Sequence, residues 1–172
     1  GYVNTLEITG CHFNNIGTKD FIDFRDGTTL NAVRVVNNTF ANGFRTFARI
    51  DASCVCSSIK VENHTFYNMC YVDNKDNNGI FHVRATTMTP ATFIVNRNLF
   101  ASMHVSEGAP TDSNGNGYPK LVSKNAAGII PTFAANYFYD VTTEGDYNWF
   151  TKDRITAEDA LAGYGVILTE TP

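Results

Sequence analysis

The apolar and polar positions of this chain follow a pattern that recurs five times. Each copy centres on a phenylalanine, and the five stretches read LEITGCHFNNI, VRVVNNTFANG, IKVENHTFYNM, FIVNRNLFASM and FAANYFYDV. The central residues are Phe13, Phe40, Phe66, Phe100 and Phe138, which follow one another at steps of 27, 26, 34 and 38 residues. A short unit that returns at such spacing predicts a repeat architecture.

The residues before each phenylalanine alternate between apolar and other types. Apolar residues stand seven and five positions before it, and in most copies a polar or charged residue lies between them. Alternation with a period of two predicts that each copy opens with a β-strand that buries one face. The apolar pairs are Leu6/Ile8, Val33/Val35, Ile59/Val61, Phe93/Val95 and, more weakly, Pro131/Phe133.

Small polar side chains recur two positions before and two positions after the phenylalanine. Asparagine tolerates the left-handed backbone of a tight bend, and its amide can satisfy backbone groups of a neighbouring coil. Both columns are therefore expected to stack along the fold. The earlier column holds Cys11, Asn38, His64, Asn98 and Asn136, and the later one Asn15, Asn42, Asn68, Ser102 and Asp140.

These patterns predict an all-β fold, a parallel β-helix of about five coils. An α-helical fold does not fit, because the pattern lacks a period of 3.6 residues. A β-propeller does not fit either, because each blade needs a longer repeat that holds four strands. The segment TAEDALAG, residues 156–163, has Thr156 as an N-cap and Gly163 as a stop, which predicts a short helix over the last coil. We therefore assign residues 1–142 to the coils and 143–172 to a C-terminal cap.

Composition narrows the class of protein. The chain has 172 residues, one domain's worth of material, and it is 43% hydrophobic. Its net charge of −4 argues against a nucleic-acid binder, and no apolar run approaches the length of a membrane span. The sequence begins almost directly in a strand without a signal peptide. Because solenoids need terminal caps, we expect it to be the C-terminal part, or a processed form, of a longer protein.

The four cysteines do not have the spacing of a zinc site. Cys11 falls in an inward column, so it is expected to be a buried free thiol. A disulfide from Cys54 or Cys56 to Cys70 is an alternative in an oxidising compartment.

A second strand follows each of the first four phenylalanines, in FIDFR (21–25), FARID (47–51), IFHVR (80–84) and KLVSK (120–124). Each carries a basic residue 14 to 17 positions before the next phenylalanine, which predicts a column of cations: Arg25, Arg49, Arg84 and Lys124. Like charges on coils about 4.8 Å apart repel, so anions must lie beside them. These anions are either Asp23, Asp26 and Asp51 in a salt-bridge ladder or the uronate or sulfate groups of a bound polysaccharide.

If the ligand is an acidic polysaccharide, this face has the residue types of a lyase. Such an enzyme needs a cation that neutralises the uronate carboxylate and a base for the C5 proton. The catalytic candidates are Arg49 and Arg84 as cations, with His82 and Lys124 as bases. The substrate-binding candidates are Arg25, Asp23 and Phe47. A lone histidine on a strand is more often structural, so the alternative that this face is non-catalytic stays open.

A calcium ion is a candidate cofactor. The sequence from Asp112 to Gly117 matches the first half of a calcium-binding loop, but Ser123 stands where the bidentate glutamate is required. Asp73 and Asp76 lie in the preceding long loop, so Asp73, Asp76 and Asp112 form a possible shared site; otherwise the segment is a turn. Tyrosines on the strands and loops are candidates for stacking on sugar rings: Tyr67, Tyr71, Tyr118 and Tyr139.

The columns NNTF, NHTF and NRNLF, with Val or Ile two positions apart upstream, resemble the pectate-lyase-like right-handed parallel β-helix superfamily. The resemblance covers roughly residues 4 to 142. It looks closest to uncharacterised β-helix domains of secreted or surface polysaccharide-processing proteins of gut-type Bacteroidetes. It implies a right-handed coil, a polysaccharide partner, a secreted or bacterial cell-surface location and a monomer. Activity differs widely within one fold. Two hypotheses follow: a polysaccharide-engaging β-helix with lyase activity on acidic glycans, and a non-catalytic glycan-binding or scaffold module of a larger surface protein.

Overall fold

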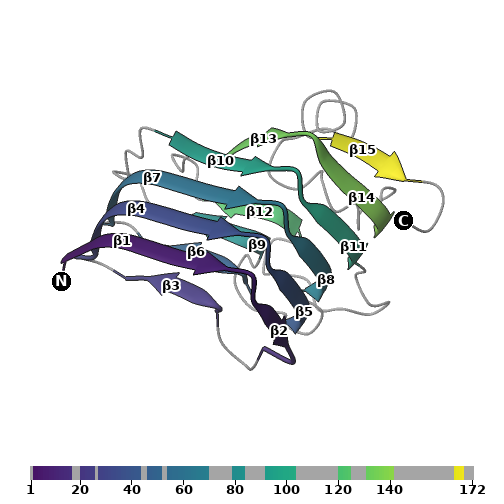
Figure 1. Ribbon diagram of the computed structural model, residues 1–172, viewed down its shortest axis with the longest axis horizontal. Helices are drawn as coiled ribbons and strands as arrows, with labels where there is room; N and C mark the ends of the chain where they lie inside the picture. The colour runs from purple at the N-terminus through teal and green to yellow at the C-terminus, as the bar shows by residue number, and fades with distance from the viewer. Residues whose placement is uncertain are drawn as a thin grey trace, which may run out of the picture.

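The computed structural model describes residues 2–16, 20–25, 27–43, 46–51, 54–69, 79–83, 92–103, 120–124, 131–141 and 165–168. Every regular element in this part of the chain is a β-strand, and the strands form three sheets in which all pairs are parallel. The chain visits the three sheets in turn and then returns one rung higher, so the fold is a β-solenoid (Figure 1). Among these residues there is no helix that could span a membrane.

The three sheets are named A, B and C in the order in which the chain meets them. Sheet A contains β1 (Tyr2–Thr9), β4 (Thr29–Val36), β7 (Val55–Glu62), β10 (Thr92–Asn96) and β13 (Thr132–Ala134). Sheet B contains β2 (His12–Asn14), β5 (Thr39–Gly43), β8 (Thr65–Met69), β11 (Leu99–Met103), β14 (Asn136–Val141) and β15 (Gly165–Leu168). Sheet C contains β3 (Ile22–Phe24), β6 (Ala48–Ile50), β9 (Gly79–Val83) and β12 (Lys120–Lys124).

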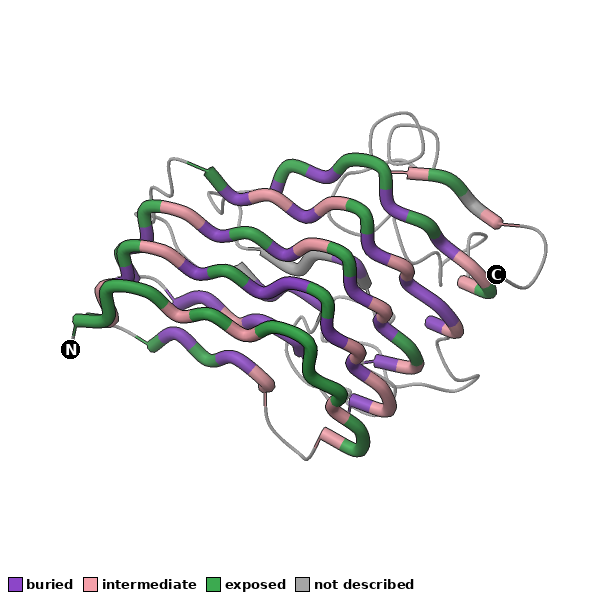
Figure 2. The backbone as a smooth tube through the Cα atoms, in the orientation of Figure 1, coloured by how far each residue is buried: buried purple, intermediate pink, exposed green. Residues whose placement is uncertain are grey.

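The recurring phenylalanines form one continuous stack inside the solenoid, as the repeat predicts. Successive rings, from Phe13 through Phe40, Phe66 and Phe100 to Phe138, have centroids 5.1, 5.3, 4.9 and 5.3 Å apart and are nearly parallel. Buried residues alternate with exposed ones along most strands (Figure 2). Stacked aromatic pairs contribute about 0.5–1.5 kcal/mol each beyond the area they bury. The stack therefore fixes the register of every coil.

Each coil turns twice through a left-handed backbone. The first turn, three positions before the phenylalanine, uses Gly10, Asn37, Asn63, Arg97 and Ala135; the second, two positions after it, uses Asn15, Asn42, Asn68, Ser102 and Asp140. All ten have φ between 47° and 66°. The later column was predicted to bend, and it does. The column two positions before the phenylalanine was predicted to face inward, and its members other than Cys11 are buried, while the residue before each of them takes the bend.

The inward column forms a buried ladder that runs from coil to coil. The backbone N–H of Cys11 donates to Asn38 Oδ1 at 2.8 Å, that of His64 to Asn98 Oδ1 at 3.0 Å, and that of Asn98 to Asn136 Oδ1 at 3.0 Å. The predicted burial of Cys11 is wrong: this residue of the first coil is exposed, and its thiol donates to the carbonyl of Thr9 at 3.3 Å. Cys54 and Cys56 are buried free thiols.

Some predictions concern parts of the chain outside the described residues. These include the capping helix at 156–163 and the partner Cys70 of the alternative disulfide. Residues 165–168, within the segment assigned to the cap, form β15, which extends sheet B by pairing with β14.

Candidate functional site

The predicted cation column lies on sheet C, but the register of that sheet differs from the prediction. Asp23, not Arg25, lies level with Arg49, and Arg49 lies level with His82. On the next strand His82 is level with Ser123, while Lys124 pairs with Val83. The predicted alignment is therefore wrong for Arg25 and Lys124. Asp23 and Arg49 both stand 17 positions before the next phenylalanine, whereas Arg25 stands 15 positions before it. In the later coils the connection from sheet C to the next phenylalanine changes length, so that Ser123 rather than Lys124 is level with His82.

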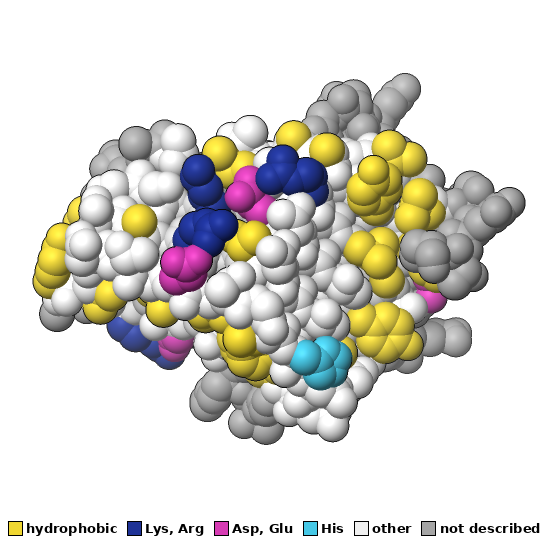
Figure 3. Space-filling model, viewed as in Figure 1, with side chains coloured by type: hydrophobic (Ala, Val, Ile, Leu, Met, Phe, Trp, Pro, Cys, Tyr) yellow, Lys and Arg dark blue, Asp and Glu magenta, His cyan; other side chains and the backbone are white. Residues whose placement is uncertain are grey.

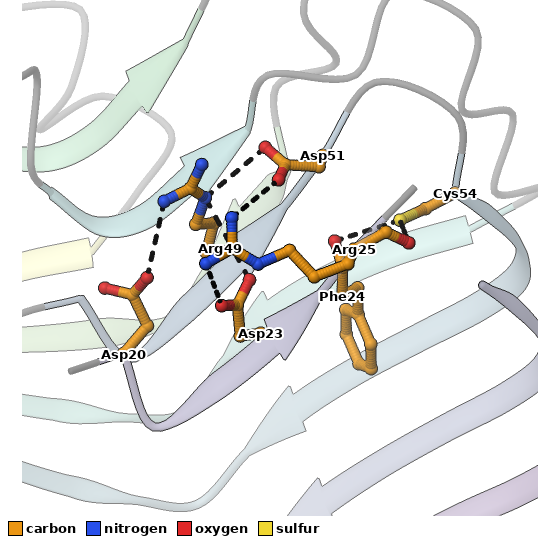
Figure 4. A network of polar contacts seen from close by, with 7 residues as sticks. All are labelled: Asp20, Asp23, Phe24, Arg25, Arg49, Asp51 and Cys54. Carbon is orange, nitrogen blue, oxygen red and sulfur yellow. Dashed lines mark hydrogen bonds and ion pairs between the residues drawn. The ribbon is translucent and has the colours of Figure 1, made fainter. Parts of the chain in front are cut away.

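The two arginines of this face lie in a compact network with aspartates (Figure 4). Arg25 contacts Asp23 at 2.7 Å and Asp51 at 3.4 Å. Arg49 contacts Asp51 at 3.3 Å, Asp20 at 3.8 Å and Asp23 at 4.0 Å. The side chain of Arg49 is only 14% exposed and that of Asp20 only 3%. Three carboxylates thus surround two guanidinium groups.

This arrangement disfavours the binding of an anion at Arg49. A carboxylate that approached Arg49 would also meet the carboxylates of Asp20, Asp23 and Asp51, all within 4.0 Å of the same guanidinium. Near a protein surface, unit charges about 4 Å apart interact by roughly 4 kcal/mol, so the repulsion offsets the attraction. Of the two predicted sources of anions, the salt-bridge ladder is present through Asp23 and Asp51. Asp20 was missed, although it directly precedes the strand motif FIDFR.

The other predicted site residues are scattered. Phe47 is fully buried and packs against Phe40, Phe66 and Phe81, with ring centroids 4.8, 5.1 and 5.8 Å away, so it belongs to the core. His82 is buried beside Arg49 in the register of sheet C. For Lys124 only the backbone is described.

The remaining candidates, Arg84, Asp26, Asp73, Asp76 and Asp112, lie outside the described residues. Within the described part of the chain, no three His, Cys, Asp or Glu side chains come together as metal ligands.

A different surface lies on sheet B, where aromatic and aliphatic side chains point outward. Tyr67 is 46% exposed and Tyr137 47% exposed, and Leu99, Tyr139, Val166 and Leu168 surround them. We call these six residues the tyrosine face. Hydrophobic side chains gather over β8, β11, β14 and β15, whereas most of the charged side chains in this view lie over sheet A (Figure 3). Sequence reasoning singled out Tyr67 and Tyr139 but not Tyr137, although it stands directly before Phe138 and so must point outward by alternation.

The parallel register aligns the tyrosine face in two rows that run along the solenoid axis. One row passes from Tyr67 through Ala101 and Tyr139 to Leu168. The other passes from Thr65 through Leu99 and Tyr137 to Val166. Successive residues of a row lie one strand spacing apart, which is about 4.8 Å. The two rows together carry three tyrosines, with Leu99, Ala101, Val166 and Leu168 among them.

Comparison with known proteins assigns no family. The chain matches no protein-family model, and neither the curated proteins nor the solved structures give a significant match.

Proposed function

We propose that this chain is a non-catalytic polysaccharide-binding module that holds its ligand on the tyrosine face. The observation that carries the proposal is the alignment of three tyrosines, Tyr67, Tyr137 and Tyr139, on one outward face of sheet B. Tyrosine offers a flat apolar ring and a polar hydroxyl. A sugar ring has the matching surfaces, since it presents apolar C–H groups on its faces and hydroxyls at its edge.

The charges of sheet C support a binding module over a lyase. Catalysis on uronates needs a cation that is free to neutralise the substrate carboxylate, and Arg49 is already surrounded by Asp20, Asp23 and Asp51. We also infer that the coils are right-handed, because crossover connections between parallel strands of one sheet are right-handed in about 98% of cases. Membership of the pectate-lyase-like superfamily, a secreted or cell-surface location and a monomeric state belong to the same proposal.

The test is a depletion assay against insoluble polysaccharides, both neutral and acidic. The protein is mixed with each polysaccharide, and the fraction that remains in solution is measured. Tyr67→Ala and Tyr139→Ala are expected to remain in solution more than the wild type. Tyr2→Ala is the matched control, because Tyr2 is an exposed tyrosine that lies on β1 of sheet A. It is expected to bind like the wild type.

Two results would overturn the proposal. One is the absence of binding to every polysaccharide of the panel. The other is binding that Tyr67→Ala and Tyr139→Ala leave unchanged while both variants show the wild-type circular dichroism spectrum. An absorbance assay for unsaturated uronides, run on the acidic members, tests the rival lyase hypothesis directly. Product formation that Arg49→Met abolishes would favour the lyase.

A further inference from the structure

The polar groups and charges around the tyrosine face define the ligand more closely than the tyrosines alone. In the described strands of sheet B the only charged side chain is Asp140, which lies at the corner and accepts a hydrogen bond from Ser102 Oγ at 2.9 Å. The chain as a whole carries 13 Lys and Arg against 17 Asp and Glu. The tyrosine face therefore offers no cation to an acidic glycan. The net negative charge of the protein would also repel such a glycan.

The shape of the face sets the direction of a bound chain. Along the direction of its strands, sheet B is short, because a left-handed corner lies near each end of a strand. Asn63 and Asn68 flank β8, and Ala135 and Asp140 flank the outward part of β14. Along the axis, the row that contains Tyr67 and Tyr139 continues from coil to coil. An extended ligand can contact several side chains of the face only if it lies along the axis.

The spacing of the tyrosines within this row is two coils. Ala101 lies between Tyr67 and Tyr139, and it is small and almost fully buried. Two strand spacings amount to about 10 Å. That length matches one disaccharide of an extended β-1,4-linked chain, in which every second sugar has the same orientation. One sugar would stack on each tyrosine, and the sugar between them would lie over Ala101.

A row of hydrogen-bonding groups runs along the corner that follows the row of Tyr67. Asn42 lies one coil before Tyr67, Asn68 lies in the coil of Tyr67, and Ser102 and Asp140 lie in the coils of Ala101 and Tyr139. Asn42 Nδ2 donates to Asn14 Oδ1 at 2.8 Å, and Asn68 Nδ2 donates to Asn42 Oδ1 at 2.9 Å. These amides repeat at the coil spacing, at the corner that follows the row of Tyr67. An amide in such a chain keeps a second donor and a second acceptor lone pair. These groups are placed to bond sugar hydroxyls at the same repeat as the coils.

From these four observations, and resting on the proposed function, we infer that the ligand is a neutral, extended β-linked polysaccharide. Its chain lies along the solenoid axis, with one disaccharide for every two coils. The row of Tyr67, Ala101 and Tyr139 contacts the sugar rings, and the corner residues of the same coils, Asn68, Ser102 and Asp140, bond the hydroxyls along one edge.

The test uses cello-oligosaccharides of two to six units as neutral probes, with the same oligomers oxidised at C6 to uronates as matched acidic probes. Affinity is measured by isothermal titration calorimetry. The neutral series is expected to gain affinity sharply from two to three units, because three units are needed to reach both tyrosines. Tyr67→Ala or Tyr139→Ala is expected to lower affinity about tenfold and to remove that step. The oxidised series is expected to bind at least several-fold more weakly at low salt.

The failures of this inference and of the proposed function are distinguishable. If polysaccharides bind in the depletion assay but the oxidised oligomers bind as tightly as the neutral ones, the inference of a neutral ligand is overturned. If affinity does not step with length, or if the two tyrosine variants differ in no way from Tyr2→Ala, the axial arrangement is overturned. A dimer in sedimentation velocity that Tyr67→Ala and Tyr139→Ala dissociate, without glycan binding, would show instead that a second copy occupies the face.

Discussion

His64 provides a sharp test of the buried ladder because it is the one rung that titrates. It takes the place that asparagine has in the coils on either side, and it is buried. The backbone N–H of Asn38 donates to its Nδ1 at 2.9 Å, so the proton must be on Nε2, which donates to the carbonyl of Val35 at 2.8 Å. The ring is therefore held in the neutral form, and protonation of Nδ1 would remove an acceptor from the interior.

The pKa of His64 is lowered from its ordinary value chiefly by burial, against which the backbone hydrogen bonds with Val35 and Asn38 and the charge of Glu62 act in the opposite direction. In the unfolded chain the imidazole has a pKa of about 6.5. Between the lowered folded pKa and this value, the unfolded state binds more protons than the native state. The free energy of unfolding must then fall as the pH drops below about 6.5, by at most about 1.4 kcal/mol for each pH unit.

The perturbation is His64→Asn, which restores the residue found at the neighbouring rungs. Urea unfolding of wild type and variant at several pH values from 7.5 to 4.5 gives the difference in unfolding free energy, in which the other titrating groups cancel. We expect the wild type to lose stability relative to the variant as the pH falls below about 6.5, with a slope of at most about 1.4 kcal/mol per pH unit. If the two stabilities stay parallel over this range, the reasoning about His64 is refuted. His64→Ala leaves a buried donor and acceptor unpaired and should cost about 2–5 kcal/mol at pH 7.5.

Three further predictions concern the coils. Ala135 has φ 53°, a left-handed conformation that costs a residue with a Cβ about 1–2 kcal/mol. Ala135→Gly should therefore raise the midpoint of urea unfolding. A lowered midpoint would contradict the inference that Ala135 is strained. Asn98→Ala removes a fully buried side chain that donates to Val61 O and Asn136 Oδ1, and it should lower the free energy of unfolding by about 2–4 kcal/mol. Asn42→Ala, on the outer row, should lower it by less than about 1 kcal/mol. Equal losses in the two variants would refute this difference. Arg49→Met leaves the buried Asp20 without that cation and should cost about 3–5 kcal/mol, against under about 1 for the largely exposed Arg25→Met, by thermal or urea unfolding.

The sequence predicts the fold well because the packing of the core imposes both the two-residue alternation within each strand and the repeat from one phenylalanine to the next. Each phenylalanine must stack on the next, so the step between Phe40 and Phe66 is visible without coordinates. The register of sheet C could not be predicted in the same way. No repeated aromatic marks its rungs, and the turn that leads from it to sheet A changes length. Arg25 and Arg49 stand 15 and 17 positions before the next phenylalanine, which predicts that they are nearly level, whereas Asp23, which stands 17 positions before Phe40, is the residue that pairs with Arg49.

The candidate site was less predictable because outward side chains are not constrained by packing. Tyr67 and Tyr139 could be recognised singly, but their common row depends on the register of β8, β11 and β14. The repeat gives this row once the phenylalanines are known to stack, since each tyrosine directly follows its phenylalanine. Tyr137 could have been found by the same rule. Asp20 could not, because it precedes the strand and reaches Arg49 only through the curvature of the chain.

The separation of charge and aromatic side chains among the three sheets follows from the same repeat. In a solenoid, a residue type that recurs at one position of the coil becomes a stripe along the whole molecule, inside or outside. The ion pairs Arg34–Glu7 and Arg97–Glu62 lie on and beside sheet A, and the network of Arg25 and Arg49 lies on sheet C. In each case the charges neutralise one another between neighbouring coils. Sheet B has no such pairs on its described strands, and there the exposed apolar surface is instead that of tyrosine. A surface that avoids charge while exposing rings two coils apart is suited to a partner with a matching linear repeat, which is why an extended glycan fits this face better than a globular protein does.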